Sequence, residues 1–226
     1  MKTTFKVVLF VFVAAFYSCG KDEVSSTSSS ITSSGVMSGT ISNYGVSPVD
    51  SIHFNGSNAI VSSGGKFSST IAIPKSADLH DFEAPTTGVT ISDVNALISE
   101  LKIVPYSNSV VGELTKTNYS ENITSLDGLA FSEFLYCDRD ATIKGSYSGD
   151  IDIMYGISIS GIITFDVKLK KGWNEIVYTV EKMSLITGDA TVRVSNTVPS
   201  DLKWVFLGQD NAGSASKVKA LKSSLK

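Results

Sequence analysis

The feature that most constrains this fold is a strict alternation of apolar and polar residues in the second half of the chain. In the run IDIMYGISIS, one face collects Ile151, Ile153, Tyr155, Ile157 and Ile159. In the run GIITFDVKLK, the same face continues with Ile163, Phe165, Val167 and Leu169. Successive side chains of a β-strand point to opposite faces of its sheet, so a period of two indicates strands. The sequence therefore predicts long strands that are apolar on one face.

A tight turn is expected directly after this run. Lys170-Lys171-Gly172 ends in a glycine, which adopts the positive φ of a three-residue hairpin loop without strain. The residues that follow alternate again, with the apolar side chains of 176–180 on one face. We therefore expect a hairpin in which the strand at 163–169 pairs with the strand at 176–180.

Shorter alternating runs, separated by glycine turns, fill the rest of the chain. They predict strands at 37–43, 50–55, 66–73, 99–106, 109–117, 131–137, 141–148, 189–195 and 203–207. The segment 91–98 fits a short helix and, nearly as well, a strand. Many short strands of this kind are typical of an all-β antiparallel sandwich, immunoglobulin-like or transthyretin-like, with at most short helices.

The length of the chain bounds its domain organisation. About 190 of the 226 residues lie beyond a leader and a serine-rich tether, enough to bury roughly 70% of the unfolded surface in one core. We expect one sandwich domain at 36–208, with a subdivision near 74–90 as the alternative. A Lys/Ser-rich tail follows at 209–226.

The first 18 residues form a basic and then apolar leader. Lys2 and Lys6 flank its start, and the apolar run 7–16 would span about 15 Å as a helix, half of a bilayer core. Such a segment is typical of a cleaved signal peptide rather than a permanent membrane span. It ends at Cys19, which is followed at once by charged residues.

This leader resembles those of bacterial lipoprotein precursors, whose cleavage box ends in a small residue before a cysteine, as in Ser18-Cys19. The resemblance implies that Cys19 is lipidated, and two or three acyl chains anchor a protein stably in a membrane. Lys21-Asp22-Glu23 resembles the export signal that sends Bacteroidota lipoproteins to the outer leaflet of the outer membrane. The resemblance therefore implies a protein of the cell surface.

The segment 19–35 is rich in Ser and Thr and reads as a flexible tether between the membrane and the domain. The alternative is a secreted protein cut near Ala14 or Ala15. It would carry a lone free thiol in an oxidising compartment, which is unfavourable.

Two further resemblances concern the domain itself. GTISNYGVSPVDSIHFN, followed by GGKFSSTIAI, resembles the first half of transthyretin-like or carboxypeptidase-regulatory β-sandwiches. FDVKLKKGWNEIVYTVE, with the later DLKWVFL, is similar to the C-terminal part of Bacteroidales lipoproteins. Neither resemblance implies an activity.

Charge and motif content argue against two classes of function. The formal net charge is −3 and the cations are not clustered, so we expect no nucleic-acid partner. The chain has only two histidines, His53 and His80, and no nucleophile elbow, zinc-protease motif or phosphate loop. We therefore expect no enzyme and no cofactor, although paired carboxylates for glycoside hydrolysis escape this argument.

Acidic residues gather at three places between strands. In the first, KSADLHDFEAP carries Asp78, His80, Asp81 and Glu83; the others are Asp138 with Asp140, and Asp150 with Asp152. Oxygen ligands suit calcium, but the spacing of a calcium-binding loop is absent, and zinc takes more nitrogen or sulfur ligands. We therefore expect solvated loops and no metal site.

Three single residues complete the candidates. Trp173 opens a strand beside a turn and is the aromatic residue we expect to be exposed for stacking on a sugar ring. Asp50-Ser51-Ile52 resembles a Bacteroidota O-glycosylation sequence, which makes Ser51 a candidate modification site. Cys137 lies in an apolar strand and is expected to be a buried, inert thiol.

Together these features predict a lipid-anchored, surface-facing outer-membrane protein. We expect a non-catalytic binding or structural module of the cell envelope, with a glycan or an envelope protein as its partner. One alternative is a fimbrial or adhesive subunit, which would exchange strands with its neighbours across an unpaired edge. Another is a secreted hydrolase, which would place His53 or His80 in a cleft beside a carboxylate and a hydroxyl.

Overall fold

The computed structural model describes residues 31–32, 34–45, 48–82, 87–107, 112–119, 125–154, 157–184 and 189–208, without the side chains of 150–160. These residues form fifteen β-strands and one 3₁₀ turn, η1 (Ser76–Asp78), arranged in three sheets. The expected all-β, antiparallel, sandwich-like architecture is confirmed. Of the alternating run at 151–159, residues 151–154 lie in β11 (Ala141–Met154) and 157–159 in β12 (Ile157–Leu169), but their side chains fall outside the described ones.

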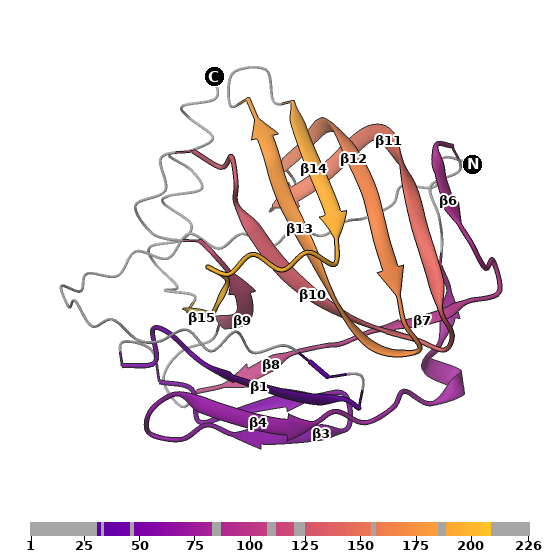
Figure 1. Ribbon diagram of the computed structural model, residues 1–226. Helices are drawn as coiled ribbons and strands as arrows, with labels where there is room; N and C mark the ends of the chain where they lie inside the picture. Colours follow the sequence, from indigo (N-terminus) through magenta and orange to yellow (C-terminus); the bar gives the residue numbers. More distant parts are fainter. Residues whose placement is uncertain are drawn as a thin grey trace.

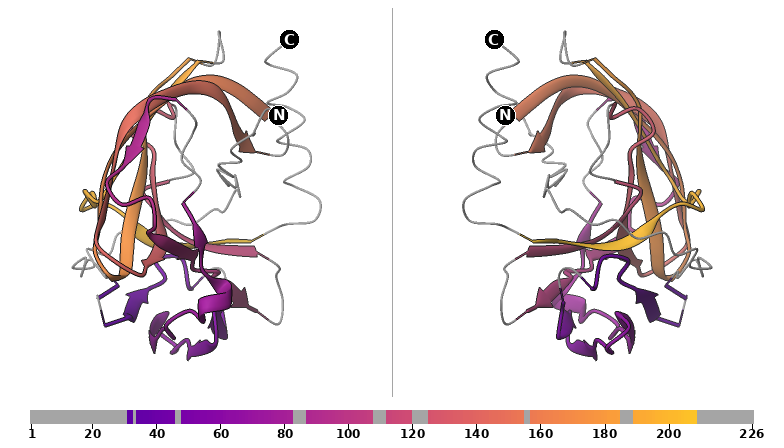
Figure 2. Two further views of the ribbon diagram at one scale, coloured as in Figure 1. Left: turned by 90° about the vertical axis from the view of Figure 1, so that its right-hand side faces the viewer. Right: turned by 90° about the vertical axis from the view of Figure 1, so that its left-hand side faces the viewer.

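The large sheet contains ten strands and is strongly curled (Figures 1 and 2). Its main path runs β15 (Lys203–Gly208), β9 (Gly112–Thr117), β10 (Ala130–Cys137), β13 (Gly172–Met183), β14 (Ala190–Ser195), β12 (Ile157–Leu169), β11 (Ala141–Met154) and β6 (Val89–Ile91). β7 (Leu97–Glu100) also pairs with β10, and β5 (His80–Asp81) pairs with β7. The sheet is mixed, because β12 and β14 run parallel.

Two small sheets lie beneath the large one (Figure 1). One pairs β1 (Val36–Thr40) with β4 (Lys66–Thr70), and the other has the order β3 (Ser57–Ile60), β2 (Ser51–Phe54), β8 (Val104–Tyr106). Met37, Ile52 and Phe67 of the small sheets share one core with Phe134 and Trp204 of the large sheet. The sandwich is therefore formed between the small sheets and one face of the large sheet.

The predicted hairpin between 163–169 and 176–180 is wrong. Gly172 does adopt a positive φ of 105°, but β14 lies between β12 and β13 and pairs with both. Beyond the end of β14, the side chain of Asn196 continues the separation, accepting a hydrogen bond from Lys168 N and donating one to Glu175 O. A turn motif specifies a local reversal of the chain, but it does not specify which strands pair. Here β14 forms the backbone hydrogen bonds that β12 and β13 would have made with each other.

Asn174 lies at the turn between β12 and β13, where these two strands separate. Its side-chain amide accepts a hydrogen bond from Lys170 N and donates to the carbonyl oxygens of Lys170 and Gly172. Asn174 is 8% exposed, so these bonds are made inside the protein. They replace the backbone partners that a regular hairpin would supply.

Several other elements between residues 57 and 106 differ from the sequence prediction. The segment 91–98 is not a helix: β6 ends at Ile91, a turn follows with Asn95 N bonded to Asp93 Oδ1, and β7 begins at Leu97. The single strand expected at 99–106 is two strands in different sheets, and β3 was not predicted. The Asn55 side chain accepts a hydrogen bond from Lys102 N at this crossover.

The described part of the segment 74–90 contains η1, β5 and the start of β6. Side chains from before and after this segment share one core, and the subdivision near 74–90 stays a prediction. Within the described ranges, no helix is long and apolar enough to span a bilayer. The leader at 1–18, the segment 19–30 of the tether and the tail at 209–226 lie outside those ranges.

The outer edge of β15 is covered by the segment after β1. Ile41 forms a parallel bridge to Trp204, and Ser42 N donates to Trp204 O. The Asn43 side chain then accepts from Phe206 N and donates to Phe206 O. This coverage satisfies backbone groups that would otherwise template pairing with another chain.

Replacing Asn174 by alanine is expected to lower the free energy of unfolding by about 2 kcal/mol, because buried backbone groups lose their partners. Urea unfolding followed by tryptophan fluorescence measures this loss. Asn58→Ala, at an exposed position of β3, is the control and should change stability by less than about 0.5 kcal/mol. Equal effects of the two variants would contradict the assigned bonds.

Candidate functional site

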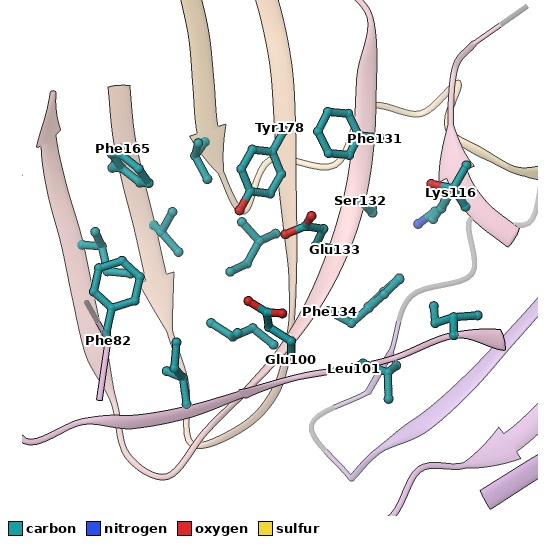
Figure 3. A pocket seen from close by; sticks show the side chains of 18 of the residues that line it. Phe82, Glu100, Leu101, Lys116, Phe131, Ser132, Glu133, Phe134, Phe165 and Tyr178 are labelled. Carbon is teal, nitrogen blue, oxygen red and sulfur yellow. The ribbon is translucent and has the colours of Figure 1, made fainter. Parts of the chain in front are cut away.

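The concave side of the large sheet encloses a cavity of about 410 Å³ (Figure 3). Its walls come from β10, β13, β14, β12 and β11, and its remaining sides from β5, β7 and β9. The lining is largely apolar and includes Phe82, Phe131, Leu135, Phe165, Ile176 and Val194. A cavity of this size and composition suits a small ligand.

The cavity lies where β10 changes partners. On one edge, β10 pairs first with β9, at Phe131 and Ser132, and then with β7, from Leu135 to Cys137. β7 and β9 diverge in between, so neither strand is registered opposite Glu133. This fork in the sheet creates the space that the cavity occupies.

Three glutamates line this fork, one from each strand: Glu100 of β7, Glu113 of β9 and Glu133 of β10. Glu133 shares the inward face with Phe131 and Leu135 because side chains alternate along the strand. Figure 3 shows the carboxyl groups of Glu100 and Glu133 directed into the same part of the cavity. These carboxyl groups give an otherwise apolar cavity one acidic end.

The Tyr178 hydroxyl points at this end from β13 and donates a hydrogen bond to Glu133 (Figure 3). The ring of Tyr178 stacks on Phe131, with centroids 5.0 Å apart and planes inclined by 7°. This aromatic pair adjoins the carboxyl groups and forms a flat part of the wall.

Burial changes the acidity of these groups. It raises the pKa of Glu133 from 4.5 to about 7, and the charges of Glu100 and Glu113 add to this, while the bond from Tyr178 opposes it. Burial alone raises the pKa of Glu113 to about 7. Burial and the adjacent Glu133 also raise the pKa of Tyr178 well above its usual value. Near neutral pH the acidic end therefore exchanges protons readily.

A buried ion pair lies at the edge of the cavity, which Lys116 and Ser132 also line. Lys116 Nζ of β9 is 2.7 Å from Glu175 Oε1 of β13, and Ser132 Oγ of β10 donates to the same oxygen at 2.6 Å. The two charged side chains are only 2% and 5% exposed. Three adjacent strands are thus joined beside the cavity, next to the core shared with the small sheets.

The expectation that Trp173 is exposed is wrong. Trp173 is only 4% exposed, and its ring packs edge-on against the ring of Tyr136, with centroids 5.5 Å apart. The turn before it is at the surface, but the small sheets cover this face of β13, so the indole joins the core. A buried ring cannot stack on a sugar, which removes Trp173 as a glycan site.

The remaining sequence candidates fall in different places. Cys19, Lys21, Asp22 and Glu23 lie outside the described residues. Ser51 is half-buried in the central strand of the β3–β2–β8 sheet, and its glycosylation stays a prediction. Cys137 is buried and free, and burial raises the pKa of its thiol, as expected for an inert cysteine.

The acidic residues of one loop, Asp138 and Asp140, have structural partners. Asp138 accepts a hydrogen bond from Leu97 N and pairs with Arg139, which together lower its pKa, while Asp140 binds Lys170. No group of three His, Cys, Asp or Glu residues with metal-binding geometry occurs among the described residues. Glu83 and the side chains of the pair at 150 and 152 are outside them.

The two histidines are far apart in the fold. His53 lies on β2 against the ring of Tyr106, with centroids 4.3 Å apart, and is remote from the cavity. His80 lines the cavity from β5. In the described structure no side-chain hydrogen bond or ion pair links either histidine to a carboxylate.

Comparison with known proteins adds no relative. No protein-family model, no curated protein and no solved structure matches this chain. The lipoprotein, transthyretin-like and Bacteroidales resemblances therefore stay predictions.

The sequence analysis missed all three cavity glutamates. A usable signal existed for Glu133, because AFSEFLYC has one carboxylate in a strand that is otherwise buried on both faces. A lone acid in that setting indicates a polar site within a core. Glu100 and Glu113 have no such local signal, because only the fork between β7 and β9 brings them near Glu133.

Glu133→Gln tests the electrostatics of the cavity. The folded protein binds this proton more tightly than the unfolded chain, so wild-type stability should fall as pH rises from 4.5 through 7. The variant should therefore be more stable than wild type at pH 8, by about 1–2 kcal/mol after allowance for water in the cavity, and similar at pH 4. Thermal unfolding across this pH range measures the difference, and a pH-independent offset would contradict the assignment.

The buried ion pair predicts a strong asymmetry between single and double replacement. Lys116→Met leaves the Glu175 carboxylate buried without its cation and should cost about 3–5 kcal/mol, and adding Glu175→Leu should restore most of this. The exposed pair Lys170–Asp140, at 2.8 Å, is the matched control, since Lys170→Met should cost less than about 1 kcal/mol. Urea unfolding of the four proteins distinguishes these outcomes.

Proposed function

We propose that this protein is a non-catalytic binding lipoprotein of the bacterial cell envelope that holds a small ligand in the cavity of its curled sheet. The cavity of about 410 Å³ carries this proposal, because its apolar walls converge on a few polar groups at one end. That combination is typical of small-molecule sites, in which apolar surface supplies affinity and placed polar groups supply orientation.

The proposal favours binding over hydrolysis for a geometric reason. The hydrolase alternative calls for a histidine beside a carboxylate and a hydroxyl, and neither His53 nor His80 has such a partner among the described side chains. The strand-exchange alternative calls for an open edge; the edge of β15 is covered through Asn43, whereas at the other side of the sheet β6 pairs with only three residues of β11. Neither the hydrolase nor the strand-exchange alternative gives the cavity a role.

The cellular location in this proposal rests on the sequence alone. The leader supports export, Cys19 supports lipidation, and Lys21-Asp22-Glu23 supports transfer to the outer surface of the outer membrane. The tether at 19–35 would then hold the cavity just clear of the lipid headgroups. A binding protein in this position meets solutes before they cross the envelope.

Filling the cavity should abolish binding without unfolding the protein. Thr115→Trp places a large ring in the cavity from β9, whereas Ile162→Trp adds the same ring at a position of β12 that is 46% exposed. Saturable binding of Nile red, a neutral apolar dye, should weaken at least about tenfold in the first variant and be unchanged in the second. Equal binding by both variants, or none by wild type, would refute a ligand site here.

The anchor is tested separately in a Bacteroidota host. Cys19→Ala should abolish the acyl modification found by mass spectrometry and release the protein from the membrane fraction. Replacing Lys21, Asp22 and Glu23 by alanine should keep the acyl groups but protect the domain from protease added to intact cells. An unmodified sulfur in the native protein would remove the lipoprotein assignment.

A further inference from the structure

We infer that the ligand is an organic amine whose positively charged head lies among Glu100, Glu113 and Glu133 and whose apolar body lies along the wall of the cavity. This inference rests on the proposed function and adds the chemical class of the ligand. It follows from the charge, the shape and the lining of one cavity.

The first step concerns charge. Glu100, Glu113, Glu133 and Asp81 line the cavity, and all four are acids. Lys116 and His80 also line the cavity, but the charge of Lys116 is already bound to Glu175 at 2.7 Å. A carboxylate or phosphate ligand would therefore meet like charges without compensation, whereas a cation would relieve their mutual repulsion.

The second step separates an organic cation from a metal ion. The described residues hold no cluster with metal-binding geometry, so the three glutamates do not converge on one point as ligands of an ion must. A bare ion would also leave most of a 410 Å³ cavity unfilled. An ammonium group on a larger apolar body satisfies both the acids and the volume.

The third step concerns the wall beside the acids. The stacked rings of Phe131 and Tyr178 adjoin Glu133, and Leu135, Ile176 and Phe165 extend the apolar surface away from it. Aromatic faces attract ammonium groups as well as apolar groups. The cavity therefore has an acidic end for a head group and an apolar end for a chain or ring.

Proton release accompanies binding of such a ligand. Glu133 is faced by Tyr178 from β13, Glu100 from β7 and Glu113 from β9, while His80 and Asp81 of β5 line the same cavity. The pKa values of Glu113 and Glu133 are about 7, and a cation favours their ionised forms. Affinity for an amine should therefore rise as pH increases through 7, while affinity for a neutral analogue should not.

Calorimetry with three ligands of one chain length tests the inference on the purified full chain. Octylamine, octanol and octanoate share an apolar body and differ in head-group charge. At pH 8 we expect octylamine to bind at least about tenfold more tightly than octanol, with octanoate weakest. At pH 5.5 the advantage of the amine should largely disappear.

Two variants locate the effect. Glu133→Gln should weaken octylamine about tenfold and leave octanol unchanged, because the amide keeps the shape and loses the charge. Asp166→Asn is the matched control: it removes a carboxylate that is 59% exposed and pairs with Lys144, outside the cavity, and should change neither affinity.

The outcomes separate this inference from the proposed function. If octanol binds as tightly as octylamine and both are blocked by Thr115→Trp, the cavity is a ligand site and the amine class is wrong. If none of the three ligands binds saturably, the amine class and the binding function fall together. Tightest binding by octanoate would likewise overturn the charge argument while keeping the site.

Discussion

The two faces of strand β10 serve two different interiors, and the rest of the architecture depends on this. Phe131 and Leu135 face the concave side of the large sheet, whereas Phe134 and Tyr136 enter the core shared with the small sheets. A strand covered on both faces loses the plain alternation of an exposed sheet, and β10 is apolar along most of its length. The small sheets and the cavity are thus supported by one strand.

The same strand explains why an acidic group lies in an apolar interior. Where β10 exchanges β9 for β7, the ladder is interrupted, and the widened space admits the side chain of Glu133, which remains accessible to solvent. At the edge of the cavity, the bond network of Lys116, Ser132 and Glu175 ties β9, β10 and β13 together beside the interruption. The sheet tolerates this opening because the side-chain bonds of Lys116, Ser132 and Glu175 join β9, β10 and β13 next to it.

The local sequence pattern predicted the all-β fold class, but it did not predict which strands pair with each other. Alternation identified 163–169 as a strand because it reports which residues share a face, and 131–137 was predicted as an apolar strand. It carries no information about neighbours, so the insertion of β14 between β12 and β13 was not foreseen. Trp173 was misplaced for the same reason, since its cover comes from residues more than a hundred positions earlier in the chain. Of the cavity glutamates, only Glu133 had a sequence context that marked it.

The split between β12 and β13 also bears on the order of events during folding. A chain that emerges N-terminus first during synthesis presents β12 and β13 before β14, and two adjoining apolar strands can pair as a hairpin. That premature ladder would have to reopen to admit β14. In the finished sheet the side chain of Asn174 bonds backbone groups of Lys170 and Gly172, so these bonds favour the split arrangement over that ladder. One buried amide at the turn thus helps to select the distant strand partner over the nearer one.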